Sequence, residues 1–152
     1  MTAYAERIRR LRESTGLTQR EMSAHLGVLD SNYDDLELYD DELFHVPSIQ
    51  AIRDMCSLLR IPPIELCAPE NAHIDTVKRV EYKQLVDIVT NHMVANSMSL
   101  MDFENAIGWK LEQFFEGEES FLEHYNISFL VDLSSRLRLN WLSLLPQARV
   151  AG

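Results

Sequence analysis

Apolar residues recur at intervals of three and four along almost the whole chain, and this period limits the possible folds more than any other feature. The clearest stripe is Ile49, Ile52, Cys56 and Leu59. Such spacing places the apolar side chains on one face of an α-helix. No run of strict apolar and polar alternation is long enough to indicate a strand. Because the chain has 152 residues and is 46% hydrophobic, it can build a core, and we predict an all-α protein.

Local signals mark where the first helices begin and end. The first helix carries an apolar stripe of Tyr4, Ile8 and Leu11. Gly16 would end it. Thr18 followed by Glu21 has the pattern of a capping box that opens a second helix, and Gly27 would stop that helix.

Three further helices are expected before residue 68. A third helix begins near Leu29 or Asp30. Pro47 and Ser48 open the fourth, which carries the stripe described above. A short fifth helix follows Pro63, because proline suits a first helical turn.

The polar segment "APENAHIDT" separates two regions of the chain. We therefore expect a five-helix domain at residues 1–68, a linker at 69–75 and an all-α domain at 76–152. Asp75 or Thr76 would cap the first helix of the second domain. Its apolar stripe is wide enough to predict a helix at the centre of a bundle.

Two longer helical patterns complete the second domain. "MDFENAIGWKLEQFF" at residues 101–115 predicts one helix, ended by Gly117. Residues 118–145 predict one or two helices interrupted near Asn126. That segment has a main apolar stripe of Leu130, Leu133, Leu137, Trp141 and Leu144, and a second flank of Phe129, Leu139, Leu142 and Leu145. Two flanks indicate either a core packed on both sides or a self-association surface, and we favour a homodimer.

Charge is distributed unevenly over this acidic protein, whose formal net charge is −10. Residues 1–28 contain five arginines and three glutamates. Residues 29–48 contain seven carboxylates and neither lysine nor arginine. We refer to residues 29–48 as the acidic segment. Such a balance disfavours non-specific nucleic-acid binding, which depends on cations that neutralise phosphates.

The stretches "RIRRLRESTGLTQREMSAHLGV" and "PSIQAIRDMCSLLRIPPIEL" resemble the repressor-type helix-turn-helix family, also called the XRE family. The resemblance covers about residues 4–68 and implies a DNA-binding domain of five helices. Family members usually end the third helix with a glycine where this chain has Tyr39. Without that glycine, the sequence allows the third helix to continue through "LYDDEL" at residues 38–43.

The resemblance also implies roles for individual residues. Gln19, with Arg20 beside it, would contact a DNA phosphate from the start of the second helix. Arg12 and Glu37 match a structural pair that ties the first helix to the end of the third. The first turn of the third helix would reach base edges, and this region corresponds to Asp30, Ser31 and Asp35. Family members usually have Gln, Arg, Ser, Thr or Asn at such positions.

The acidic segment admits four interpretations. It is a solvated surface, or its carboxylates lie against the basic first helix, or it recognises a basic protein partner, or it contacts DNA directly. An aspartate can accept a hydrogen bond from cytosine N4, which keeps the last interpretation open. A protein-recognition surface would use five aspartates: Asp30, Asp34, Asp35, Asp40 and Asp41.

Motifs of other functional classes are not recognisable in the sequence. The five histidines show no metal-binding spacing, and Cys56 and Cys67 are too far apart for a short metal-binding pair. We find no nucleophile with a base and no glycine-rich phosphate loop, so we expect neither an enzyme nor a cofactor or metal. No segment has the length and apolarity of a membrane span or the pattern of a signal peptide, and we expect a cytoplasmic protein without membrane contact.

Two hypotheses result. The first is a DNA-binding transcriptional regulator with a helix-turn-helix domain and an all-α dimerisation or effector domain. The second is a degenerate helix-turn-helix protein that binds a protein partner through its acidic third helix and does not bind DNA.

Overall fold

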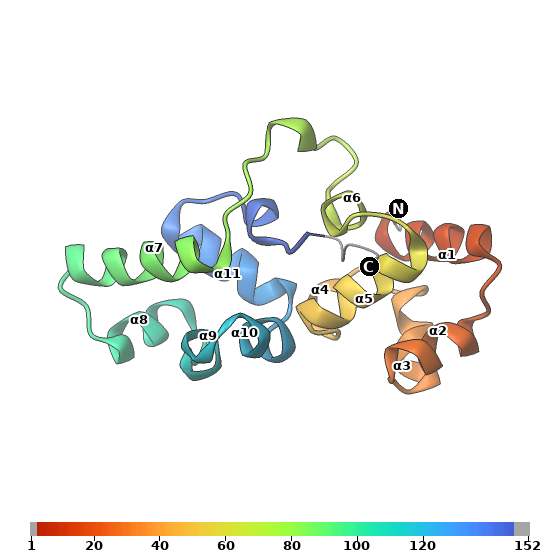
Figure 1. Ribbon diagram of the computed structural model, residues 1–152, viewed down its shortest axis with the longest axis horizontal. Coiled ribbons are helices and arrows are strands. Elements are labelled where there is room, and N and C mark those ends of the chain that lie inside the picture. Colours follow the sequence, from red (N-terminus) through yellow and green to blue (C-terminus); the bar gives the residue numbers. More distant parts are fainter. Residues whose placement is uncertain (1–2, 148–152) are drawn as a thin grey trace.

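The computed structural model describes residues 3–147, and every regular element in that range is helical. The prediction of an all-α protein is therefore confirmed. Two groups of helices lie side by side along the longest axis of the molecule, α1 to α6 in one group and α7 to α11 in the other (Figure 1). The first group consists of α1 (Ala3–Thr15), α2 (Gln19–Leu26), α3 (Asp30–Leu36), α4 (Glu42–His45), α5 (Ile49–Leu59) and α6 (Pro63–Cys67).

The caps of the first group follow the local sequence signals. Thr18 caps α2 and forms the capping box with Glu21, with N–O distances of 3.1 Å in both directions. Gly27 ends α2 in the left-handed conformation, with φ of 66°. A glycine suits this position because other residues with a side chain rarely adopt positive φ. Ser48 caps α5, and Pro63 stands in the first turn of α6.

The third helix is shorter than the sequence allowed. α3 ends at Leu36, and the chain then turns into the separate one-turn helix α4. The third helix therefore does not continue through residues 38–43, although the sequence allowed it, and α4 adds a helix to the five predicted. Glu37 binds Arg12 and Asp40 binds the first turn of α1. These two contacts direct the backbone away from the α3 axis.

The second group begins later than predicted. Asp75 and Thr76 lie in a short 3-10 helix, η1 (Ile74–Thr76), and the first long helix is α7 (Tyr82–Ala95). Glu81 caps α7 through a capping box with Gln84. The buried residues of α7 are Leu85 and Val89, so α7 packs through one side and is not the central helix.

Gly108 divides what the sequence predicted to be one helix. α8 (Leu100–Ile107) ends at Gly108, which has φ of 80°, and α9 (Glu112–Glu116) starts a turn later. The side chain of Glu104 accepts a hydrogen bond of 2.7 Å from the backbone of Leu111 and closes this turn. An interior glycine weakens a helix, so a local side-chain contact can stabilise the break.

The end of the chain contributes most of the core of the second group. α10 (Glu118–His124) and α11 (Ile127–Leu137) are separated near Asn126, as the sequence predicted. The side chain of Asn126 also caps α11. Arg138 then adopts the left-handed conformation, and the chain forms the 3-10 helix η2 (Trp141–Leu144). Trp141 and Leu144 therefore do not continue the stripe of α11 on one helix.

The second apolar flank belongs to the core of the chain. Phe129, Leu142 and Leu145 are buried, and Leu139 packs against the buried cluster. Of the two interpretations of this flank, a core packed on both sides is the one realised here. Any self-association surface must lie elsewhere.

The two groups of helices share one buried cluster. Ile49 at the start of α5 donates a backbone hydrogen bond of 2.8 Å to the carbonyl of Tyr125. The side chain of Asn126 donates one of 2.9 Å to the carbonyl of His45. Phe44 of α4 packs edge-on against Trp141, with ring centroids 5.4 Å apart. In residues 3–147, no helix is long and apolar enough to cross a membrane.

Candidate functional site

The start of α2 and the first turn of α3 form one surface. The turn that joins the two helices is short, and Val28 in it packs against the core. A shallow depression between them is lined by Thr18, Gln19, Arg20, Asp30 and Asp34. Ser31 is exposed on the first turn of α3, and Asp35 is half-buried one turn further along. Of the five residues that the sequence analysis assigned to DNA contact, Gln19, Arg20 and Asp30 line this depression. Ser31 and Asp35 lie on the same helix α3 but do not line it.

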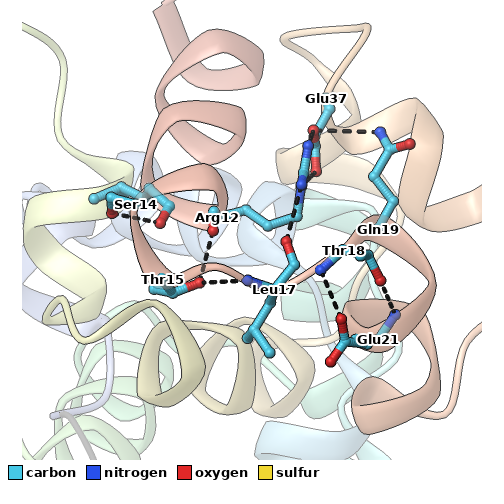
Figure 2. Close-up of polar contacts among 9 residues, drawn as sticks. Arg12, Ser14, Thr15, Leu17, Thr18, Gln19, Glu21 and Glu37 are labelled. Atoms are coloured by element: carbon cyan, nitrogen blue, oxygen red, sulfur yellow. Dashed lines mark hydrogen bonds and ion pairs between the residues drawn. The ribbon is translucent and has the colours of Figure 1, made fainter.

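A buried ion pair holds this surface in place. Arg12 of α1 binds Glu37 through two hydrogen bonds, Nε to Oε2 at 2.7 Å and Nη2 to Oε1 at 2.9 Å (Figure 2). The side chains of Arg12 and Glu37 are 13% and 2% exposed, so water screens the pair weakly. Arg12 Nη1 also donates to the carbonyl of Leu17, at 3.0 Å. The pair therefore connects α1, the α1–α2 turn and the end of α3.

The protonation of this centre is fixed by its surroundings. Hydrogen bonding to Glu37 raises the pKa of the Arg12 guanidinium. Tyr33 is fully buried beside the pair, and burial raises the pKa of its hydroxyl, with Glu37 raising it further. Arg12 is therefore cationic and Tyr33 neutral across the physiological pH range.

Gln19 extends the centre to the surface. Its Nε2 donates to Glu37 Oε1 at 3.3 Å, a long hydrogen bond (Figure 2). Gln19 is nevertheless exposed at the start of α2. One residue therefore touches both the structural pair and the solvent-facing surface.

Asp30 forms contacts with two residues of α2. Its Oδ1 accepts a hydrogen bond from the buried hydroxyl of Ser23 on α2. Its other oxygen lies 3.8 Å from Arg20 Nε, although both side chains are largely exposed. Asp30 thus joins the start of α3 to α2, and its remaining face is open to solvent.

Asp40 caps α1, a role that the sequence analysis missed. Its Oδ1 accepts hydrogen bonds from the backbone N–H groups of Tyr4 and Ala5, at 3.1 and 2.9 Å. A carboxylate at this place satisfies two N–H groups that have no partner within the helix, and it complements the positive helix end. No local signal marks this contact, because the partners are more than 30 residues apart in the sequence.

Four other carboxylates of the acidic segment remain unpaired. Asp34, Asp35, Asp41 and Glu42 make no side-chain hydrogen bond or ion pair with any described residue. Large apolar side chains are exposed in the same segment: Leu29, Leu38, Tyr39 and Val46. The segment therefore offers unpaired negative charge next to exposed apolar area.

The arginines of α1 are mostly used elsewhere. Arg7 donates to the carbonyls of Leu66 and Ala68 at 2.7 and 2.8 Å and so binds the C-terminal end of α6. Arg9 and Arg10 lie near Glu6 on the exposed side of α1. Arg20, 87% exposed, is the cation that lines the depression between α2 and α3.

The part of the chain that the structure describes contains no metal-binding cluster and no reactive cysteine. No three His, Cys, Asp or Glu side chains among residues 3–147 are placed to hold a metal ion. Cys56 and Cys67 are free and buried. Burial raises the pKa of the Cys56 thiol to about 12, which keeps it in its unreactive protonated form.

Comparison with protein-family models, with curated proteins and with solved structures gives no significant match.

Replacing Glu37 with Gln is expected to destabilise the fold by about 3 kcal/mol, because it leaves the guanidinium of Arg12 buried without its counter-charge. Glu42→Gln serves as the matched control, since Glu42 belongs to the same segment and has no ion pair, and it should change stability by less than about 0.5 kcal/mol. Urea unfolding monitored by circular dichroism measures both. Equal stability of the two variants would show that the pair does not hold the fold.

Asp40→Asn is expected to cost about 1 kcal/mol, because the amide is a weaker acceptor and carries no charge to complement the end of α1. The neighbouring change Asp41→Asn removes the same charge from a side chain without a hydrogen bond and should be close to neutral. Thermal unfolding of the two variants side by side makes the comparison. If Asp41→Asn were the more damaging change, the capping role of Asp40 would be wrong.

Proposed function

We propose that this chain is a DNA-binding transcriptional regulator of the repressor helix-turn-helix type, with α2 and α3 as the helix-turn-helix. The observation that carries the proposal is the surface formed by the start of α2 and the first turn of α3. It exposes Gln19, Arg20 and Ser31 together, and the buried Arg12–Glu37 pair fixes its geometry. The family resemblance of residues 4–68 supports the same function.

In the proposed complex, α2 contacts the DNA backbone and α3 enters the major groove. Gln19 and Arg20 approach a phosphate at the positive end of α2. The long hydrogen bond from Gln19 to Glu37 can be exchanged for one to a phosphate oxygen. Ser31 and Asp35 face base edges, and an aspartate there favours cytosine through its N4 amino group.

The acidic segment is less repulsive to DNA than its composition implies. Glu37 is neutralised by Arg12, Asp40 caps α1, and Asp30 is held by Ser23 and Arg20. Four carboxylates without a partner remain, and they weaken attraction to phosphates at any sequence. The proposal therefore requires low non-specific affinity, with selectivity arising from base contacts.

A second function is favoured by a different observation. Leu38 and Tyr39 are 60% and 55% exposed and lie in the same segment as the unpaired carboxylates. Such a surface suits a partner protein that presents an apolar group surrounded by lysine or arginine. In this alternative, Asp30, Asp34, Asp35, Asp40 and Asp41 would form the recognition surface. Asp40 already caps α1, so it would contribute least.

We further propose that the regulator is a cytoplasmic homodimer, since two copies would read two half-sites. Val94, Leu100 and Met101 at the α7–α8 turn are exposed apolar residues and supply a candidate contact. Met101→Lys should shift the chain toward monomer in sedimentation equilibrium. Ser135→Lys, an equal charge change at an exposed position of α11, should not. A monomeric native chain would refute the dimer.

DNA affinity of charge-reversed variants separates the two functions. Asp34→Lys with Asp35→Lys is expected to raise affinity for a mixed-sequence duplex at least tenfold at about 50 mM salt, because two repulsive groups become attractive. The matched control is Glu118→Lys with Glu119→Lys, an equal charge change at the start of α10, which should have a smaller effect. Fluorescence anisotropy at about 50 and 200 mM salt measures the affinity and its salt dependence.

Two results would argue against DNA binding by this surface. One is equal gains from both double variants, which would indicate a net-charge effect alone. The other is a combined result for the chain with Asp34→Lys and Asp35→Lys. This chain would no longer cross-link to a protein partner that the control variant still binds, and its DNA affinity would not rise. That pattern would favour the protein-binding alternative.

A further inference from the structure

A cavity of about 430 Å³ lies where the segment after α6 meets the end of the chain. Its apolar walls come from three places in the sequence: Pro62, Pro63 and Ile64 at the start of α6, Ile74 and Val77 around η1, and Leu142 in η2. The chain passes from α6 through η1 before it reaches α7 (Figure 1). Protein sites for small molecules commonly have volumes of about 300–1,000 Å³, so the cavity is large enough for a ligand.

The walls are apolar yet incompletely buried. Ile64, Ile74 and Val77 are branched aliphatic residues that remain half-buried although they pack against the core. Prolines form part of the lining and have no backbone N–H to offer. The open part of the cavity wall is therefore apolar surface in contact with water, and burying it under an apolar ligand lowers the free energy.

The two sides of the cavity are fastened to each other. The backbone N–H of Val80 donates to the carbonyl of Ser143 at 2.9 Å. Arg79 Nη1 donates to the carbonyl of Leu145 at 3.0 Å. These bonds join the segment before α7 to the end of the chain and maintain the cavity as a formed site.

Arg79 is the charged side chain that lines the cavity. Its Nε pairs with Glu81 at 2.9 Å, and its Nη1 binds the carbonyl of Leu145. The Nη2 group makes no hydrogen bond to any described residue. The side chain is 29% exposed, whereas that of Glu81 is 60% exposed. A half-buried guanidinium thus keeps free donors in an apolar surrounding.

We propose that this cavity binds a small apolar carboxylic acid, with the hydrocarbon part against the aliphatic walls and the carboxylate on Arg79. A single cation beside apolar walls complements one negative charge with an apolar body. Polyanions fit poorly, because Glu81 lies next to the same guanidinium. This site goes beyond the proposed DNA-binding function. A ligand there would contact both α6 and η2, and so link the two groups of helices.

Titration calorimetry of the full chain with octanoate and with 1-octanol tests the proposal. Octanoate is expected to bind one site per chain, at least tenfold more tightly than octanol, because only octanoate has the carboxylate. Arg79→Gln should remove this preference. Val77→Trp should lower both affinities at least tenfold, because the larger side chain fills the cavity. Arg10→Gln, the same change on the exposed side of α1, should alter neither.

Absence of octanoate binding would overturn the proposal. Equal affinities for octanoate and octanol would overturn the assignment of a carboxylate ligand, and undiminished binding by Val77→Trp would place the ligand elsewhere. Because Arg79 also binds the carbonyl of Leu145, circular dichroism must establish that its variant folds. If Arg79→Gln does not fold, the affinities of the native chain and of Val77→Trp for octanoate and for 1-octanol still test the proposal. No readout involves DNA, so failure here leaves the proposed function standing.

Discussion

The buried pair of Arg12 and Glu37 is the interaction on which the candidate site depends. It joins the first helix to the end of α3, and its further bond to the carbonyl of Leu17 fixes the turn between α1 and α2. A buried, bidentate ion pair has a strongly directional geometry, because neither side chain can move without breaking its hydrogen bonds to the other. The relative placement of α2 and α3, and with it the surface of Gln19, Arg20 and Ser31, follows from this constraint.

The acidic segment serves two purposes. Part of it stabilises the fold: Glu37 pairs with Arg12, Asp40 caps α1, and Asp30 binds Ser23. The rest, including the half-buried Asp34 and Asp35, has no hydrogen-bond or ion-pair partner among the described residues and leaves negative charge on α3. Composition alone gave seven equivalent negative charges, whereas the structure divides them by role. Under the proposed function, the four unpaired carboxylates would keep the affinity for arbitrary DNA low.

Features with a local physical cause were predictable from the sequence, and features created by distant contacts were not. The capping box of Thr18 and the stop at Gly27 depend on neighbouring residues, so both were predicted. The early end of α3 depends on Arg12 and on α1, and no local pattern reveals it. Gly108 could have indicated the break between α8 and α9, but the apolar period continues across it and predicts one helix. The candidate DNA-contact residues of α2 and α3 came from family resemblance, and the structure places Gln19, Arg20 and Asp30 around one depression.

Nuclear magnetic resonance of the labelled chain, titrated with a mixed-sequence DNA duplex at low salt, tests the central claim most directly. We expect backbone amide signals of residues 18–20 and 30–31 to shift together, because these residues form the proposed contact surface. Signals of the second group of helices, α7 to α11, should remain in place. Shifts confined to residues 38–46 or to the second group would contradict DNA recognition by α2 and α3.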